Sequence, residues 1–398
     1  MNIGKIRSDF PALGNFVWFQ NGGVSITPAP VAEAHIGLMR ELLERGPMHI
    51  AYPDEEYPRR ERSRERLAAF FGVSPGDLAL MRGVSEAFQT VIRGLDWNAG
   101  DRILISEEEE VALLVPCLHL RDLYGVVVDK APLVDDADEQ VEAVVGRITD
   151  RTRLIGFSHV ISDSGYRLPA ERICAAARAR GVVSFLDMAH SAGLYPMNLN
   201  RLGCDFAGIL SYKWMYSPYA AGALFARADR RDRIRVTYAG GRAQDWVDFR
   251  RDRFELKEST ERFEFGPWSW PLVHAWAAAV EYLTCIGLDA IWARTVVLTT
   301  RLKRGLNEIP GVRLITPLSP EQSAAVVGFN LDGWQPLHVR DALRKRWRIV
   351  VKAFNTTRQG LRASVPFFLL EEEIDLLLHA LATLASEGPG RPSAGSLA

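Results

Sequence analysis

The 398-residue chain has few cysteines, no long apolar run and almost no excess of charge of either sign. Its four cysteines are widely separated and form no Cys-x-x-Cys pair, so neither a disulfide framework nor a structural zinc site is expected, and no metal is predicted. No stretch approaches the roughly 20 apolar residues that span a bilayer. A net charge of −1 offers no basic face for nucleic acid or an anionic membrane. The first ten residues lack the apolar core of a signal peptide, so a cytoplasmic location is expected.

The composition is typical of a packed globular protein, with 47% apolar and 24% charged residues. Between about residues 75 and 225, short apolar runs alternate with amphipathic stretches such as 85–95 and 169–180. This alternation predicts an α/β fold, in which helices cover both faces of a mainly parallel, doubly wound sheet. Ligands of such sheets bind beyond the carboxyl ends of the strands. The expected strands are 78–81, 102–105, 126–128, 154–157, 182–186, 206–210 and 222–225.

The second part of the chain predicts a smaller α+β domain. A long apolar helix at 271–285 ends at Gly-Leu-Asp, and it is followed by expected helices at 292–308, 336–345 and 371–386 and strands at 324–330, 348–352 and 361–364. We therefore predict an N-terminal segment, 1–20, that packs on the small domain, a large domain, 21–285, and a small domain, 286–386. The Gly/Pro/Ser-rich tail, 387–398, is expected to be disordered.

Two of the expected strands are followed by residues that suit catalysis. Asp187 follows the apolar run 182–186, where an acid is costly to bury unless something pairs with it. It either caps the next turn or pairs with a protonated ring nitrogen of a cofactor, which keeps the ring an electron sink. Lys213 follows the run 206–210 between two aromatic residues. It is either a solvated surface lysine or a buried one, whose lowered pKa makes the amine nucleophilic.

A third segment, 81–87, runs from an expected strand through Gly83 into a helix, with Ser85 near the start of that helix. Exposed backbone amides and the helix dipole suit a phosphate group at this position. Ser85 equally suits a simple N-cap. A phosphate cradle, an acid and a lysine therefore follow one another along the chain.

In this order and spacing, the chain resembles the class V aminotransferase family, which includes cysteine desulfurases and isopenicillin-N-epimerase-like enzymes. These are fold-type I enzymes that use pyridoxal 5'-phosphate (PLP). The resemblance covers nearly the whole chain, and its general style extends to PLP enzymes of lincosamide-type antibiotic pathways, which process cysteine S-conjugates. The segments that carry it are 19–24, 82–87, 158–165, 187–190, 212–214, 360–364 and the acidic start of the last helix, 371–375.

The resemblance implies that Lys213 binds PLP covalently and later moves protons at the substrate Cα, while Asp187 faces the pyridine nitrogen. Four further residues are implied at the cofactor: His190 and Ser162 near the phenolic oxygen, and the Val84 amide and Ser85 side chain at the phosphate. His159, beside Ser162, is expected to be structural. Because fold-type I sites are built from two subunits, a homodimer with shared active sites is also implied.

The resemblance also implies how an amino-acid substrate binds. Arg362 matches the arginine that grips the substrate carboxylate, for which a planar bidentate donor is apt; its alternative role is a structural ion pair. Asn21 lies in the Asn-Gly entry loop and is expected near the substrate. Arg242, among many nearby aromatic residues, is expected to line a wide pocket that admits more than a simple amino acid.

Two departures from the family pattern change the expected chemistry. Desulfurases carry a cysteine shortly before the carboxylate-binding arginine, but the segment 352–359 contains none, so cysteine desulfurase chemistry is not expected. The aromatic ring that stacks on the cofactor in relatives is also missing, and Glu110 or Val111 takes its place. The four acids at 107–110 are typical of a solvated turn. If Glu110 instead faces the cofactor, it adds an acid/base group or leaves room for a bulky substrate.

The third departure concerns the phosphate contacts. Tyr212 precedes the lysine where histidine is common, and Leu210 replaces a phosphate-binding serine of some members, so Ser211 is expected to substitute. The segment 266–269 replaces a Gly-Thr that reaches a neighbouring subunit's phosphate, and Ser269 is the candidate to take over that contact.

Three functions remain in competition. The leading hypothesis is a PLP-dependent lyase that releases a thiol from a bulky cysteine S-conjugate by β-elimination, in secondary metabolism. The second keeps the cofactor but predicts decarboxylation coupled to oxidative deamination, transamination or epimerisation of a similar amino acid. The third is a non-catalytic PLP-fold scaffold, which the joint presence of Lys213, Asp187 and Arg362 disfavours.

Overall fold

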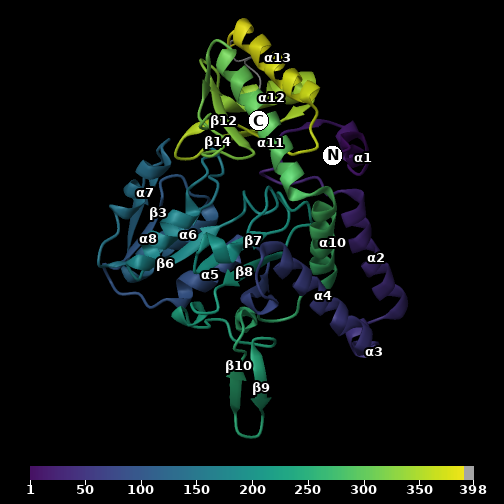
Figure 1. Ribbon diagram of the computed structural model, residues 1–398, viewed down its shortest axis with the longest axis vertical. Coiled ribbons are helices and arrows are strands. Elements are labelled where there is room, and N and C mark those ends of the chain that lie inside the picture. The colour runs from purple at the N-terminus through teal and green to yellow at the C-terminus, as the bar shows by residue number, and fades with distance from the viewer. Residues whose placement is uncertain (390–398) are drawn as a thin grey trace, which may run out of the picture.

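The central feature of the computed structural model, which describes residues 1–389, is a mainly parallel sheet (Figure 1). Its strands follow the order β2-β8-β7-β6-β5-β3-β4, and only β8 runs antiparallel to its neighbours. The predicted α/β fold is confirmed, and each predicted strand of this sheet is present. The strands are β2 (Leu78–Met81), β3 (Arg102–Ser106), β4 (Val127–Ala131), β5 (Thr152–Ser158), β6 (Val183–Asp187), β7 (Phe206–Leu210) and β8 (Gly222–Ala226).

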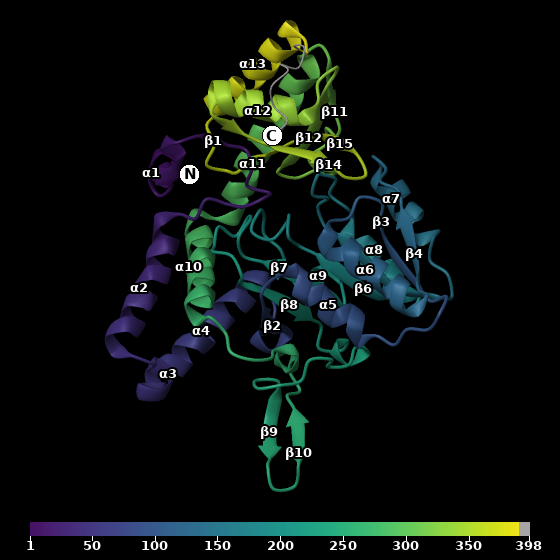
Figure 2. The same cartoon turned by 180° about the vertical axis from the view of Figure 1, so that it is seen from behind.

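Helices cover both faces of this sheet. Successive side chains of a strand point to opposite sides, and in the buried strands both sets must be covered. In β6, Phe185 belongs to one core and Leu186 to the other. The first core is shared with α5 (Val84–Gly94) and α6 (Val111–Tyr124), and the second with α4 (Pro53–Phe71), α8 (Ala170–Ala179) and α10 (Trp270–Ile286). The remaining helices of this part are α1 (Ile3–Ser8), α2 (Ala29–Arg45), α3 (Met48–Ala51), α7 (Ala137–Val145) and α9 (Leu199–Leu202), of which α2 lies alongside α10 in both views (Figure 2).

A second, antiparallel sheet lies above the first one in Figures 1 and 2. Its order is β11-β12-β15-β14, and it shares a core with three helices. These elements are β11 (Val312–Leu314), β12 (Val326–Leu331), β14 (Lys352–Asn355), β15 (Gln359–Ser364), α11 (Leu288–Glu308), α12 (Pro336–Trp347) and α13 (Glu371–Glu387). The N-terminal strand β1 (Val17–Trp18) pairs with β13 (Ile349–Val350) beside this sheet. The domain boundaries stay a prediction. The predicted tail overlaps the end of α13 at Glu387, and 390–398 lie outside the described residues.

The predicted break after the long apolar helix lies at Gly287, where the axes of α10 and α11 differ by 75°. Its φ of 91° lies in a region that glycine adopts without a steric penalty. Among the described residues, no single helix is long and apolar enough to cross a membrane; the bent α10–α11 pair passes that test by length and composition only.

A β-hairpin at 244–256 is among the elements that were not predicted. The hairpin of β9 (Gln244–Asp248) and β10 (Arg253–Leu256) projects away from the body at the bottom of Figure 1. Phe249 in its turn is 88% exposed. No residue of the hairpin belongs to a buried core among residues 1–389. The sequence therefore has no pattern of buried residues that would predict it.

Candidate functional site

The carboxyl ends of the parallel strands meet at one edge of the central sheet, where the loops that follow them enclose a cavity of about 730 Å³. Five of the residues predicted for the cofactor lie in its wall, at the ends of four strands. They are Val84 and Ser85 after β2, Glu110 after β3, Asp187 at the end of β6 and Lys213 after β7. Val84 and Lys213, which are 129 positions apart in the sequence, are thereby brought to one site, as expected for ligand sites of this fold class.

Lys213 is buried, with 9% of its surface exposed, and its Nζ lies 2.9 Å from Nε2 of His190. Burial lowers the pKa of Lys213 to about 8, because the uncharged amine needs less solvation. The loop is fixed from the N-terminal side, where Nδ2 of Asn21 donates to the Lys213 carbonyl oxygen at 3.1 Å. The lysine is therefore held still and carries a reactive amine near neutral pH.

This lowered pKa predicts how cofactor attachment depends on pH. The neutral amine is the form that attacks an aldehyde, so the rate of covalent attachment of PLP to the apoprotein rises as pH increases through about 8. An ordinary lysine would show the same rise only near its unperturbed pKa of about 10.4. The measurement is borohydride trapping at pH values from 6 to 10, followed by quantitation of the modified Lys213 peptide. A midpoint above pH 10 would contradict the prediction.

Asp187 and His190 lie beside the lysine. Asp187 accepts a hydrogen bond from the Ala189 amide at 2.7 Å. Burial raises the pKa of Asp187 to about 6, so its carboxyl group is still largely ionised at neutral pH. Burial and then the charge of Lys213 lower the pKa of His190 well below its usual value, so its ring is neutral. An ionised carboxylate in a buried wall suits a cationic N–H group in the cavity.

The phosphate cradle is formed at the start of α5. No side chain caps this helix, so the amides of Val84 and Ser85 face the cavity at the positive end of the helix dipole. The loop lies against β8, where a Cβ on Gly222 would come within 2.7 Å of Gly83 Cα. The amide donors, the carboxylate of Asp187 and the amine of Lys213 together fit the phosphate, ring nitrogen and aldehyde of PLP.

Arg362 is not among the residues that line this cavity, and it is 2% exposed. Nη1 donates to the Ser162 carbonyl oxygen at 3.1 Å, and Nη2 donates to Oε1 of Gln20 at 3.0 Å. Its Nε is buried without a partner among the described residues. Oδ1 of Asp163 lies 3.7 Å from Nη1 and forms an ion pair with the guanidinium group. Arg362 therefore combines a structural ion pair with one donor, Nε, that has no partner among the described residues. Its role as the carboxylate-binding arginine stays a prediction.

The acidic turn, Glu107–Glu110, is not the solvated turn that its composition suggested. Glu107 accepts a hydrogen bond from the Leu133 amide at 2.9 Å, and Glu108 pairs with Arg358. Glu109 accepts hydrogen bonds from Ser106 and Ser158, and burial raises its pKa to about 7. Glu110 accepts a hydrogen bond from Ser162, within the cavity wall. Each acid has its own partner, which explains why four of them occur together.

The segment 352–359 of the second sheet, which comprises β14, the turn after it and the first residue of β15, contacts the acidic turn. Besides the Arg358 pair, the Thr357 hydroxyl donates to the Glu107 carbonyl oxygen at 3.1 Å. Lys352 Nζ donates to Asp163 at 2.7 Å, and Thr356 donates to the other Asp163 oxygen at 3.1 Å. These contacts hold the segment 352–359, which contains no cysteine, against the loops of the large sheet.

Besides His190, Ser162 and Arg362, four more predicted residues do not line this cavity. The Ser211 hydroxyl donates to the Pro218 carbonyl oxygen at 2.6 Å, and Ser269 precedes α10. Arg242 has a φ of 91°, lies over the Trp270 ring at 5.3 Å and pairs with Glu264 at 3.6 Å. Asn21 supports the lysine loop. Cofactor or substrate contacts of these four residues stay predictions.

Sequence reasoning missed several residues that shape the site. Gln20 holds Arg362, and Asp163 anchors Lys352 and Thr356. Each stands next to a residue that was predicted, Asn21 or Ser162, so the motif pointed to the right segment. Arg358 gave no signal, because its partners lie about 250 positions earlier in the chain.

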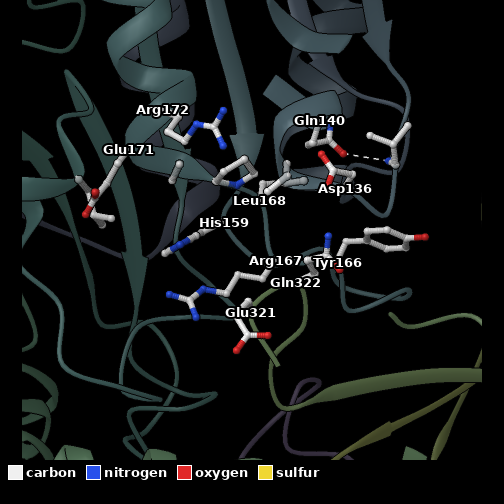
Figure 3. Close-up of a pocket in the computed structure, with 15 residues that line it drawn as sticks. Asp136, Gln140, His159, Tyr166, Arg167, Leu168, Glu171, Arg172, Glu321 and Gln322 are labelled. Carbon is white, nitrogen blue, oxygen red and sulfur yellow. Dashed lines mark hydrogen bonds between the residues drawn. The ribbon is translucent and has the colours of Figure 1, made fainter. Parts of the chain in front are cut away.

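A second cavity, of about 400 Å³, has none of the predicted cofactor-binding residues in its wall (Figure 3). His159 lines it between Leu168 and Arg167. Burial and then Arg167 lower the pKa of His159 to about 3, so the ring is neutral. This agrees with a structural role for His159. Within residues 1–389, no group of three or more His, Cys, Asp or Glu side chains is arranged to hold a metal ion.

Comparison with known proteins agrees with this geometry. The model of the family "Aminotransferase class-V" matches residues 18–377. Isopenicillin N epimerase of Streptomyces clavuligerus is 32% identical over 340 residues, which cover 82% of this chain and 84% of the relative. Probable cysteine desulfurase 2 of Mycobacterium leprae (strain TN) is 28% identical over 361 residues, covering 86% of this chain and 84% of the relative.

Solved structures of the same fold include enzymes that hold the cofactor. The cystine C–S lyase C-DES, in complex with its product cysteine persulfide, superposes with a TM-score of 0.88 at 26% identity, covering 96% of this chain and 100% of that one. A mutant of C-DES with glycine covalently linked to its PLP cofactor gives a TM-score of 0.87 at 27% identity, covering 94% and 98%. The chain therefore belongs to the class V aminotransferase family of PLP enzymes.

Proposed function

We propose that this enzyme is a C–S lyase that releases a thiol from a bulky S-substituted cysteine by β-elimination. The observation that carries the proposal is a reactive lysine amine in a large cavity whose wall contains no cysteine. Within residues 1–389, three of the four cysteines are buried, and the exposed one, Cys285, lies on α10. Without a thiol at the site, the protein cannot take up the substrate sulfur, so the sulfur leaves with its substituent.

Each residue has a defined task in this reaction. Lys213 takes the proton from Cα, and Arg362 holds the α-carboxylate. The carboxylate of Asp187 keeps a ring nitrogen protonated, so that PLP, when bound, accepts the electron pair released at Cα. The Cβ–S bond then breaks and the sulfur leaves as a thiolate, which takes up one proton. Water finally releases the three-carbon fragment, giving one thiol, one pyruvate and one ammonium ion for each substrate.

The structural neighbour described as a cystine C–S lyase supports this branch of chemistry. The relative described as an isopenicillin N epimerase supports the second candidate, epimerisation at Cα of a similar amino acid. Both start with removal of the same proton by a base in the cavity. They differ in whether a group leaves Cβ or a proton returns to the opposite face of Cα.

One incubation separates these functions. The PLP-loaded protein is mixed with S-alkyl and S-aryl cysteines, and products are identified by mass spectrometry with assays for thiol and pyruvate. Elimination predicts thiol, pyruvate and ammonium in a ratio of 1:1:1, and none with the Lys213→Ala variant. A D-amino acid with its C–S bond intact indicates epimerisation. Oxygen uptake with loss of carbon dioxide, or a requirement for a keto-acid acceptor, indicates the remaining alternatives. If the substrate stays intact under all conditions, both catalytic hypotheses are contradicted and the non-catalytic scaffold is the remaining one.

The assembly and location of the enzyme are part of the proposal. A homodimer with shared sites would bring Ser269 of one copy to the phosphate of the other, and a cytoplasmic location would keep the cysteines reduced. Size-exclusion chromatography with light scattering measures the first of these directly.

A further inference from the structure

The cavity wall contains three carboxylates, Glu86, Glu110 and Asp187, and among the described residues Glu110 is the one that neither pairs with an arginine within 4 Å nor is assigned to a ring nitrogen. Asp187 is assigned to the ring nitrogen of the cofactor. Glu86 accepts a hydrogen bond from the Arg82 amide at 2.7 Å and pairs with the Arg82 guanidinium at 3.2 Å. Glu110 accepts one hydrogen bond, from Ser162 to Oε1. Within residues 1–389 its other oxygen receives none, so it is available to a ligand.

Glu110 is charged and fixed in place. Burial alone would raise its pKa, but the Ser162 hydrogen bond and the nearby Lys213, Lys352 and Arg362 lower the pKa of Glu110 overall. The backbone on both sides is held, because Glu109 is buried under Ser158 and Val111 begins α6. A carboxylate on such a support keeps its position when a ligand binds, so its charge acts on a defined part of the cavity.

The other groups of an amino acid have places of their own. Under the proposed function, the α-carboxylate goes to Arg362 and the α-amine goes to the side of the cavity that Lys213 occupies. The side chain must then extend into the remaining volume, whose wall includes Glu110, Tyr238 and Phe265. Tyr238 and Phe265 stack on each other at 5.2 Å and offer an apolar surface. Glu110 is the charged group that this side chain meets.

We propose that Glu110 determines specificity, by selecting substrates whose side chain carries an amine or hydroxyl groups and rejecting those whose side chain carries a carboxylate. A cationic donor forms a charge-assisted hydrogen bond with the free oxygen, whereas an anionic side chain is repelled in a poorly solvated cavity. The inference deepens the proposed function, because it rests on an amino acid occupying this cavity. If Glu110 has this role, the S-substituent of the cysteine conjugate is a polar group that carries hydrogen-bond donors.

The first test measures binding rather than turnover. L-Lysine, L-norleucine and L-2-aminoadipate differ in the charge at the end of the side chain, and none has a leaving group on Cβ. For the PLP-loaded wild-type enzyme, calorimetry is expected to show lysine binding about tenfold tighter than norleucine and aminoadipate about tenfold weaker. In Glu110→Gln, which keeps the shape and the Ser162 contact, the three Kd values are expected to converge within about threefold.

The control is Asp122→Asn, which removes one charge from the same helix at an exposed position outside the cavity. It should leave the wild-type order of affinities unchanged. Equal affinities in the wild-type enzyme, an unchanged order in Glu110→Gln, or the absence of binding by all three amino acids would each overturn the proposal.

The second test separates this inference from the proposed function. Wild type and Glu110→Gln are assayed for thiol release from S-(2-aminoethyl)-L-cysteine and S-(2-carboxyethyl)-L-cysteine. A wild-type preference for the aminoethyl compound, lost in the variant, supports both proposals. Equal kcat/KM values for the two compounds in the wild type overturn the role of Glu110 alone. If neither releases thiol while the charge preference in binding persists, β-elimination is overturned and the role of Glu110 stands.

Discussion

Replacing Lys213 with alanine is expected to abolish covalent attachment of PLP and to reduce turnover about 10⁴-fold, the upper range for loss of a positioned general base. The amine at this position is buried, has a pKa lowered to about 8 and lies 2.9 Å from Nε2 of His190. No second lysine lines the cavity, so nothing in its wall can replace the amine. Borohydride reduction followed by peptide mapping measures the attachment, and single-turnover kinetics measure the rate.

The chain contains its own control for this experiment. Lys303 is 2% exposed, and burial likewise lowers its pKa to about 8. Its Nζ, however, donates to the carbonyl oxygens of Pro317 and Leu318 and lies away from the cavity. If reactivity required only a lowered pKa, both peptides would be reduced; we expect the label on Lys213 alone. Label on Lys303, or an unmodified Lys213 in PLP-loaded protein, would contradict the site assignment.

Replacing Asp187 with asparagine is expected to lower kcat by about 10²- to 10⁴-fold, which corresponds to the roughly 3–5 kcal/mol lost when one partner of a buried charge pair is removed. The amide keeps the shape but cannot carry the negative charge that holds a ring nitrogen protonated. The variant should also bind PLP more weakly, which equilibrium dialysis measures.

Asp205→Asn is the matched control, because Asp205 is also a buried acid, 4% exposed, and accepts a hydrogen bond from the Ser184 amide at 2.9 Å. It lies outside the cavity wall, so this change is expected to lower Tm without the loss of kcat. Equal losses of kcat in the two variants would mean that Asp187 acts only through stability.

Much of the fold could be predicted because its strands are fully buried. Runs such as 206–210 and 222–225 are continuously apolar, which is the pattern of a sheet covered on both faces. The hairpin 244–256 carries no such signal. None of the residues of its strand β9 is buried, and Trp246 is 39% exposed. A pair of strands that packs on no core carries no periodic pattern of apolar residues.

Only those site residues that lie in local sequence motifs could be predicted. Lys213, Asp187 and Val84 follow buried strands, so their meeting at one edge follows from a parallel sheet. The partners of the acidic turn could not be inferred in this way, since Arg358 pairs with Glu107 and Glu108 across the two sheets. The choice between a solvated and a buried turn depended on those distant contacts. Only the folded chain brings them together.

The contacts of the 352–359 loop set a condition for any attempt to redesign this enzyme as a sulfur carrier. A cysteine introduced at Thr356 would stand in a loop tied to one side of the cleft by Lys352 and to the other by Arg358. Sulfur relay requires a thiol that travels from the substrate to an external acceptor. These two contacts would hold the engineered thiol in place. A redesign would therefore have to remove them before the thiol could carry sulfur to an acceptor.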